Sequence, residues 1–149
     1  MTTSLDERRE SIAGRVSGKI ALVTGGASGI GRATAILLAE QGARVAVADL
    51  SEADGQEVIR AIESKGGEAF FSRMDVTSEA SVQNTVAQII EKWRCLDVLV
   101  NNAGVAGIQK PIHEVTAKEY DSVMDVNVRG VFHCTKHSIL AMREGGSII

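Results

Sequence analysis

Ile20-Ala21-Leu22-Val23-Thr24-Gly25-Gly26-Ala27-Ser28-Gly29-Ile30-Gly31 is the stretch that decides the fold of this chain. Its first four residues are apolar and predict a buried strand, and the apolar residues that follow at helical spacing predict a helix. The glycines between them allow a tight turn, a close approach of the main chain to a ligand, and close packing of helix on strand. A helix that begins at such a turn presents unpaired N–H groups and a partial positive charge, so the stretch predicts a phosphate-binding unit.

The glycines follow the spacing T-G-x-x-x-G-x-G, at Thr24, Gly25, Gly29 and Gly31, and not the commoner dinucleotide pattern G-x-G-x-x-G. The motif 101–104, Asn-Asn-Ala-Gly, comes later in the chain. With both motifs in this order, the sequence resembles the classical type of the short-chain dehydrogenase/reductase family over residues 19–149. The resemblance implies a Rossmann fold and the transfer of a hydride between a nicotinamide cofactor and a secondary alcohol or ketone.

Predicted strands and helices alternate along the chain, which indicates parallel strands joined by right-handed crossovers. The fold class expected is therefore α/β, a doubly wound parallel sheet in the order 3-2-1-4-5-6. The predicted strands are 20–23, 44–49, 68–74 and 96–100, and a long helix is expected from Thr116, with Glu119 in a capping box, to about Met142. Gly145-Gly146 would end that helix and Ser147 would begin a fifth strand, so we expect about four and a half strands, the N-terminal portion of such a domain.

Composition points to a single globular domain, with 149 residues of which 44% are hydrophobic and 23% charged. The net charge of -3 argues against a general nucleic-acid binder, and no apolar run is long enough to cross a membrane. Residues 1–17 mix acidic and basic side chains and lack the marks of a targeting signal, so we expect a flexible leader before a dinucleotide-binding domain at 18–149. Cys95 and Cys134 form no C-x-x-C pattern, which favours reduced thiols in a cytoplasmic protein.

The nature of the cofactor depends on Asp49, which ends the second predicted strand at the separation from the glycine turn where Rossmann units place an acid on the adenosine ribose. A 2′-phosphate there would meet a like charge, and unit charges about 4 Å apart repel by about 4 kcal/mol at an effective dielectric constant of about 20. Ser28 and Leu50-Ser51 offer no compensating base, so the sequence predicts NAD and not NADP. The alternative is that Asp49 only caps the following helix.

Other positions follow from the resemblance, which assigns Asp75 and Val76 to the adenine. Asn101 and Asn102 have amides that can tie neighbouring strand ends together, and the small residues after them leave room for a cofactor. The full predicted cofactor-binding set is Gly25, Ser28, Gly29, Ile30, Gly31, Asp49, Leu50, Asp75, Val76, Asn102, Ala103 and Gly104.

Asn127 is the one catalytic residue that the resemblance assigns, as the asparagine whose local helix distortion frees a carbonyl to hold a water in a proton relay. The alternative is a satisfied core asparagine. The serine, tyrosine and lysine of the family cannot be assigned, because the only tyrosine, Tyr120, is followed four residues later by Met124 and not by a lysine. Tyr120 is expected to pack against apolar residues. We therefore expect a chain truncated before Tyr-x-x-x-Lys and largely inactive alone; the alternative is a non-catalytic shortened product that binds a nucleotide or a partner.

His133 and His137 have the spacing of a metal pair on a helix, but no third ligand is recognisable, so a solvated helix face is favoured and no metal site is predicted. A flavodoxin-like nucleotide binder is disfavoured by the positions of Asp49 and Asn101. The loop 105–115 is the one segment expected to border the substrate, a small-molecule alcohol or ketone. The resemblance also implies a homo-oligomer, a dimer or tetramer, for the complete form.

Overall fold

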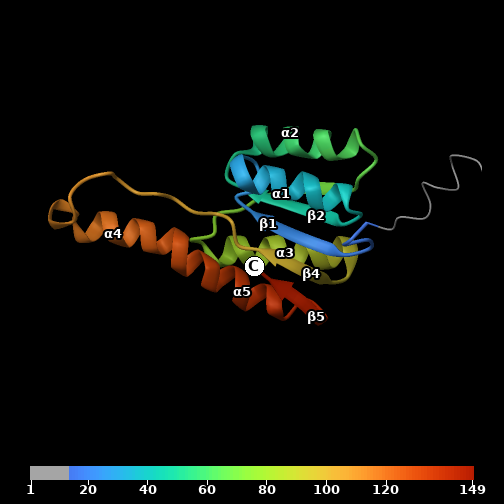
Figure 1. Cartoon of the computed structure of the whole chain (residues 1–149). Helices are drawn as coiled ribbons and strands as arrows, with labels where there is room; N and C mark the ends of the chain where they lie inside the picture. Colours follow the sequence, from blue (N-terminus) through green and yellow to red (C-terminus); the bar gives the residue numbers. More distant parts are fainter. Residues whose placement is uncertain (1–13) are drawn as a thin grey trace, which may run out of the picture.

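The computed structural model describes residues 14–149, which form a five-stranded sheet with helices on both faces (Figure 1). All the strand pairs are parallel and the strand order is β3-β2-β1-β4-β5, which confirms the predicted doubly wound α/β fold. The elements are β1 (Ile20–Thr24), α1 (Gly29–Glu40), β2 (Arg44–Asp49), α2 (Glu52–Glu63), β3 (Ala69–Arg73), α3 (Glu79–Trp93), β4 (Leu96–Val100), a 3-10 turn (Ile112–Glu114), α4 (Ala117–Met124), a π-helical segment (Asp125–Arg129), α5 (Gly130–Ile139) and β5 (Met142–Ile148).

Alternation along the strands divides the core between the two faces of the sheet. Ile20 and Leu22 of β1 pack with the apolar residues of α3, whereas Val23 packs with those of α1 and α2. In β2 the adjacent residues Ala46 and Val47 likewise point to opposite faces of the sheet, because successive side chains of a strand alternate. Because both faces of the central strands are covered, these strands consist almost entirely of buried apolar residues, as parallel sheets require.

Side chains at the helix starts agree in part with the predicted caps. Thr116 and Glu119 form the complete capping box that the sequence predicts at α4, and the Ser78 side chain accepts the Ser81 N–H at α3. At α2 the Ser51 hydroxyl instead donates to the Asp54 carboxylate, so these two residues do not form a capping box. The helix start predicted at Thr116 is therefore confirmed.

The long helix predicted from Thr116 to about Met142 is wrong in two respects. A π-helical segment interrupts it at Asp125–Arg129, and α5 ends at Ile139. The chain then turns into β5 at Met142, five residues before the predicted start at Ser147, and Met142 pairs with Leu96. Gly145 has a positive φ of 80° in the irregular part of this strand, so it serves a strand irregularity and not a helix end.

Of the predicted leader 1–17, residues 1–13 lie outside the described residues. Gly14–Ser17 form a turn against the end of α1, where the Val16 N–H donates to the Gln41 carbonyl. Within residues 14–149, no helix combines the length and the apolar character needed to span a bilayer.

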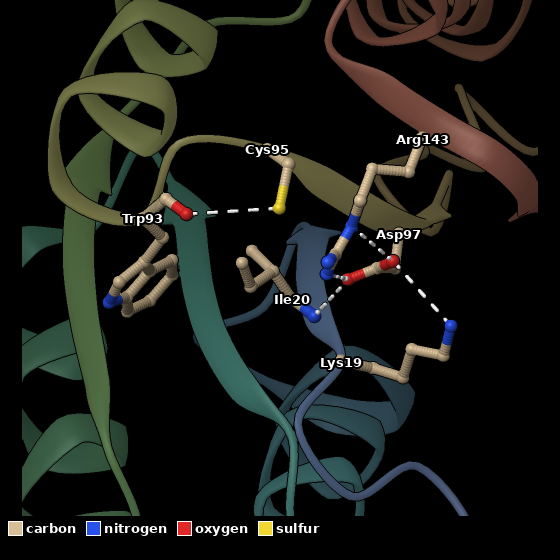
Figure 2. A network of polar contacts seen from close by, with 6 residues as sticks. All are labelled: Lys19, Ile20, Trp93, Cys95, Asp97 and Arg143. Carbon is tan, nitrogen blue, oxygen red and sulfur yellow. Dashed lines mark hydrogen bonds and ion pairs between the residues drawn. The ribbon is translucent and has the colours of Figure 1, made fainter.

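Asp97 joins three strands at the amino end of the sheet (Figure 2). The carboxylate is 4% exposed and accepts the Ile20 N–H at 2.9 Å. Arg143 of β5 donates to both carboxylate oxygens, at 3.1 Å and 2.7 Å, and the Lys19 ammonium lies 3.6 Å away. One buried acid therefore ties the start of β1 to β4 and β5.

Burial raises the pKa of Asp97, but the hydrogen bonds from Arg143 and Ile20 and the charges of Arg143 and Lys19 outweigh it, so that the pKa lies below its usual 3.8. A carboxyl whose pKa is lower in the folded than in the unfolded chain stabilises the fold above the unfolded pKa. That stabilisation is lost as the pH falls through the folded value.

We predict that Asp97→Asn lowers the free energy of unfolding by about 2 kcal/mol at pH 7, because it leaves the Arg143 guanidinium without its charged partner. This figure is below the ~3–5 kcal/mol typical of a fully buried pair, since Arg143 and Lys19 are half exposed. Urea denaturation measures the change, with Asp121→Asn, an exposed acid of α4, as the control. The difference should shrink below about pH 4 as Asp97 becomes protonated; a difference that stays constant to pH 2 would contradict this account.

Candidate functional site

The site begins where β1 and β4 lie side by side and the chain leaves them toward opposite faces of the sheet. The Thr24 hydroxyl accepts the N–H groups of Asn102 and Ala103, both at 3.0 Å. The Asn102 amide donates in return to the carbonyls of Thr24 at 2.9 Å and Gly25 at 3.0 Å. These bonds fix the two strand ends against each other, as was expected of Asn102.

Asn101 does not act in the same way, although the sequence suggests that both amides tie strand ends. Its backbone N–H donates to the Ile149 carbonyl, but its buried Oδ1 has no hydrogen-bond partner among residues 14–149. Of the two asparagines, therefore, Asn102 is the one whose side chain bonds to the end of β1 within residues 14–149.

The glycine turn between β1 and α1 is open to solvent on one side and packed on the other. Gly29 has a positive φ of 51° and faces open space, so a ligand can approach its backbone. A side chain at Gly31 would instead collide with the Gly25 carbonyl and come within 2.5 Å of the Asn102 amide. Ser28 is the N-cap of α1, but its side chain makes no capping hydrogen bond. The first N–H groups of α1 therefore have no side-chain cap from Ser28, and the residues that carry them, Gly29 and Ile30, border the cleft described next.

A cleft of about 410 Å³ lies at this edge of the sheet. It is bordered by the glycine turn, the ends of β2 and β3, the segment after β4 and the π-helical segment. Every predicted cofactor-binding residue except Gly31 lines it, and Gly31 lies behind the turn. Sequence reasoning missed two lining residues, Met74 and Val126, which are apolar side chains without a motif of their own, whereas Val105 belongs to the loop 105–115 that was expected to border the substrate.

Asp49 lies at the end of β2 and faces the cleft. One carboxylate oxygen accepts the Ala27 N–H of the glycine turn at 3.0 Å, and the other accepts the Ser51 N–H at 3.1 Å. A carboxylate has about four acceptor positions, so each oxygen can still accept a hydrogen bond from a ligand. Asp49 accepts a hydrogen bond from Ser51 at the start of α2, but it also accepts one from the glycine turn. Its role is therefore not limited to capping α2.

Arg73 is a basic residue that sequence proximity did not reveal. It ends β3, pairs in register with Asp49, and is exposed beside a depression shared with Leu50 and Asp75. The strand register thus brings a positive charge to the end of β2, where the neighbours in sequence offer none.

Asp75 and Val76 follow β3 and form the far wall of the cleft. The Asp75 carboxylate accepts both the N–H and the hydroxyl of Thr77, at 2.9 Å and 2.7 Å, and the Asp75 N–H donates to the Ser81 hydroxyl. These contacts shape a short turn before α3 and leave Asp75 half-buried at the cleft.

Asn127 lies in the middle of the π-helical segment, where the backbone of the helix is distorted. Its amide is not in the core: the residue is exposed, and the side chain bonds to the N–H and the carbonyl of Val105, at 2.8 Å and 2.9 Å. The alternative of a satisfied core asparagine is therefore wrong, because the loop after β4 supplies the partners that the core would otherwise have to provide.

Besides the contact between Val105 and Asn127, a second contact holds the loop 105–115: Lys110 forms an ion pair with Glu119 of α4. The hydrogen bond from Lys110, with those from Thr116, lowers the pKa of Glu119 to about 2, so the pair stays charged at neutral pH. Tyr120 lies beside this contact and is 56% exposed, so the apolar packing role expected for it is wrong.

His133 and His137 do not form the solvated helix face that the sequence suggests. His133 is buried and its Nδ1 lies 2.9 Å from the Val76 carbonyl, whereas the Nε2 of His137, which is largely buried, lies 2.8 Å from the Glu79 carboxylate. Each ring bonds to a different segment of the chain, so the two are not directed at a common point.

Comparison with known proteins places this arrangement in a family. The family model described as short chain dehydrogenase matches residues 19–149. The 2,5-dichloro-2,5-cyclohexadiene-1,4-diol dehydrogenase of Sphingobium indicum is 44% identical over 132 residues, which cover 89% of this chain and 52% of that protein. The 3beta-hydroxysteroid dehydrogenase of Mediterraneibacter gnavus is 40% identical over 138 residues, covering 93% of this chain and 50% of that protein.

A solved structure, a short-chain dehydrogenase/reductase from Serratia marcescens, superposes with a TM-score of 0.85 and is 35% identical. The match covers 89% of this chain and 54% of that one, so the chain spans about half the length of the relatives it matches. The strand order, the glycine turn and these matches agree, and the chain belongs to the short-chain dehydrogenase family.

Proposed function

We propose that this chain is the cofactor-binding portion of an NAD-dependent short-chain oxidoreductase, which moves a hydride between a secondary alcohol or ketone and nicotinamide. The observation that carries the proposal is Asp49, a carboxylate held at the cleft by two backbone N–H groups with acceptor capacity left over. Family membership implies a nicotinamide cofactor, and Asp49 favours the form without a 2′-phosphate.

The residues at the cleft fit a dinucleotide. Gly29 leaves an open approach to the uncapped N–H groups of α1, which suit a diphosphate. Asp49 would accept hydrogen bonds from the adenosine ribose, and the segment Asp75–Val76 would border the adenine. When bound, the nicotinamide supplies the hydride acceptor or donor, while the residues of this chain bind and orient it.

We predict that NAD binds more tightly than NADP, as measured by calorimetry on the 149-residue chain. Asp49→Asn should shift the ratio of the two affinities toward NADP by at least about tenfold, because it removes the charge that faces a 2′-phosphate. The change also weakens the bonds to Ala27 and Ser51, which lowers both affinities. The ratio therefore isolates the charge effect.

Glu52→Gln is the matched control, since Glu52 is an exposed acid three residues away that does not line the cleft. Arg73→Gln tests the nearby base: a loss of NADP binding alone would show that Arg73 pairs with the 2′-phosphate. Tighter binding of NADP than of NAD by the unchanged chain would overturn the choice of cofactor.

Asn127 is proposed as the catalytic asparagine of the complete protein. The π-helical segment around it supports this role, because such segments leave a backbone carbonyl without its usual helical partner, where a water can bind. The two hydrogen bonds to Val105 also hold the loop that borders the cleft. Asn127 would thus position the water through the helix backbone and the loop through its amide.

We predict that Asn127→Ala, made in a protein that carries this chain together with a Tyr-x-x-x-Lys segment, lowers kcat at least about tenfold and changes the Kd for NAD by less than about threefold. Steady-state kinetics and calorimetry measure the two quantities. Asp121→Asn, an exposed change on α4, is the control. An unchanged kcat would remove Asn127 from the mechanism.

The rest of the proposal concerns the whole protein. The 149 residues contain no Tyr-x-x-x-Lys, so we propose that this portion alone is largely inactive. Exposed apolar side chains on α4 and α5, Tyr120, Phe132 and Ile139 among them, support a homo-oligomer, a dimer or tetramer, for the complete form. We propose a cytoplasmic protein with a small-molecule alcohol or ketone as substrate. Reading the coding frame past Ile149 distinguishes this proposal from a non-catalytic shortened product.

A further inference from the structure

We propose that His133 is a positioning residue for the cofactor cleft, acting through the carbonyl of Val76. The inference rests on the proposed function, since it concerns how tightly the cleft holds an adenine nucleotide. His133 itself does not line the cleft; Val76, its hydrogen-bond partner, does. The two residues are 57 positions apart in sequence and belong to separate elements.

The contact between them is short and buried. The Nδ1 of His133 lies 2.9 Å from the Val76 carbonyl oxygen, and both residues are less than a tenth exposed. A carbonyl can only accept, so Nδ1 carries the proton and donates it. The bond therefore fixes both the tautomer of His133 and the height of Val76 above α5.

Val76 also packs directly against the start of α5. A side chain at Gly130 would come within 2.7 Å of the Val76 Cγ2 atom and 2.9 Å of its Cβ atom, so Val76 rests directly on the bare backbone of the helix. Gly130 and His133 are three positions apart and share one side of α5. Gly130 allows Val76 to approach the helix closely, and His133 holds the Val76 carbonyl by a hydrogen bond.

The position of Val76 determines the far wall of the cleft. Asp75 and Val76 both line it, and Asp75 is fixed on its other side by Thr77 and Ser81. Without the bond from His133, the segment would be anchored at Asp75 but free to shift at Val76. If Val76 then occupied its present position, the one that suits the ligand, only about one tenth of the time, the apparent affinity for a ligand would fall about tenfold.

Substitution of His133 by asparagine and by glutamine distinguishes the proposed positioning role from a general effect on stability. The Nδ2 of an asparagine is attached to Cγ, as is the Nδ1 of histidine, so His133→Asn keeps a donor in the same place. In His133→Gln the amide lies one bond farther out, and His133→Leu has no donor. All three changes disturb the packing, but only the asparagine can restore the bond to Val76.

The experiment is calorimetric titration of the 149-residue chain and its variants with NAD and with AMP, at a temperature where circular dichroism shows each variant to be folded. We expect His133→Leu and His133→Gln to bind both ligands about tenfold more weakly, and His133→Asn to stay within about threefold of the unchanged chain. The affinity for AMP should fall by the same factor as the affinity for NAD, since the affected wall would face the adenosine half of the cofactor.

His137→Leu is the matched control, because His137 lies one turn later on α5 and bonds to Glu79, which does not line the cleft. It should alter stability without altering either affinity. Gly130→Ala is a second probe, expected to weaken binding by displacing Val76, and it remains usable if the changes at position 133 prevent folding.

Equal affinities for the unchanged chain and a folded His133→Leu variant would overturn the inference, as would an asparagine variant as weak as the glutamine one. If only Gly130→Ala can be studied, unchanged binding by it would overturn the inference too. Failure of the proposed function looks different: the unchanged chain would then bind neither nicotinamide cofactor, nor AMP.

Discussion

The hydrogen bonds between Thr24 and the start of the segment after β4 are the contact on which the site depends. The backbone ladder between β1 and β4 runs from Ala21 to Val23, and the side chains of Thr24 and Asn102 continue the connection where that ladder stops. Because the Asn102 amide also holds the Gly25 carbonyl, against which Gly31 packs, the shape of the glycine turn is set by a residue 77 positions away. A buried amide that lost these acceptors would remain unpaired, so the contact specifies one arrangement of the turn.

The cleft is built from two halves with different origins. The glycine turn and Asp49 come from the first strands and are joined by the bond from the Ala27 N–H to the Asp49 carboxylate. The opposite wall is held by the α4–α5 region, through His133 at Val76 and through Asn127 at Val105. The same distorted helix therefore holds the far wall of the cleft and carries the proposed catalytic asparagine. A shift of this helix would move Val76 and Val105 together.

The features that the sequence predicts well are those set by local spacing. The strand order was expected from the alternation of strands and helices, because parallel strands bring their carboxyl ends to one edge. Most of the cleft-lining residues were expected from the two motifs and Asp49, and Asp75 and Val76 from the family resemblance. The helix distortion around Asn127 was expected only from the family resemblance, and the early start of β5 and the burial of His133 were not predictable from local spacing. Each depends on a partner distant in sequence: the loop at Val105, the edge of β4 and the carbonyl of Val76. Arg73 was missed for the same reason, since only strand register places it beside Asp49.

The two ends of the sheet show why an acid can serve structure in one place and recognition in another. Asp97 lies at the amino end, where Arg143, Lys19 and the Ile20 N–H surround it and lower its pKa. Its charge is fully compensated within the chain, so nothing remains to attract a ligand. Asp49 lies at the carboxyl end and, within residues 14–149, bonds to backbone N–H groups and to no basic side chain. A carboxylate that is oriented but not neutralised keeps both its charge and its free acceptor positions for a ligand, and this difference supports the proposal that the ligand binds at the carboxyl end of the strands.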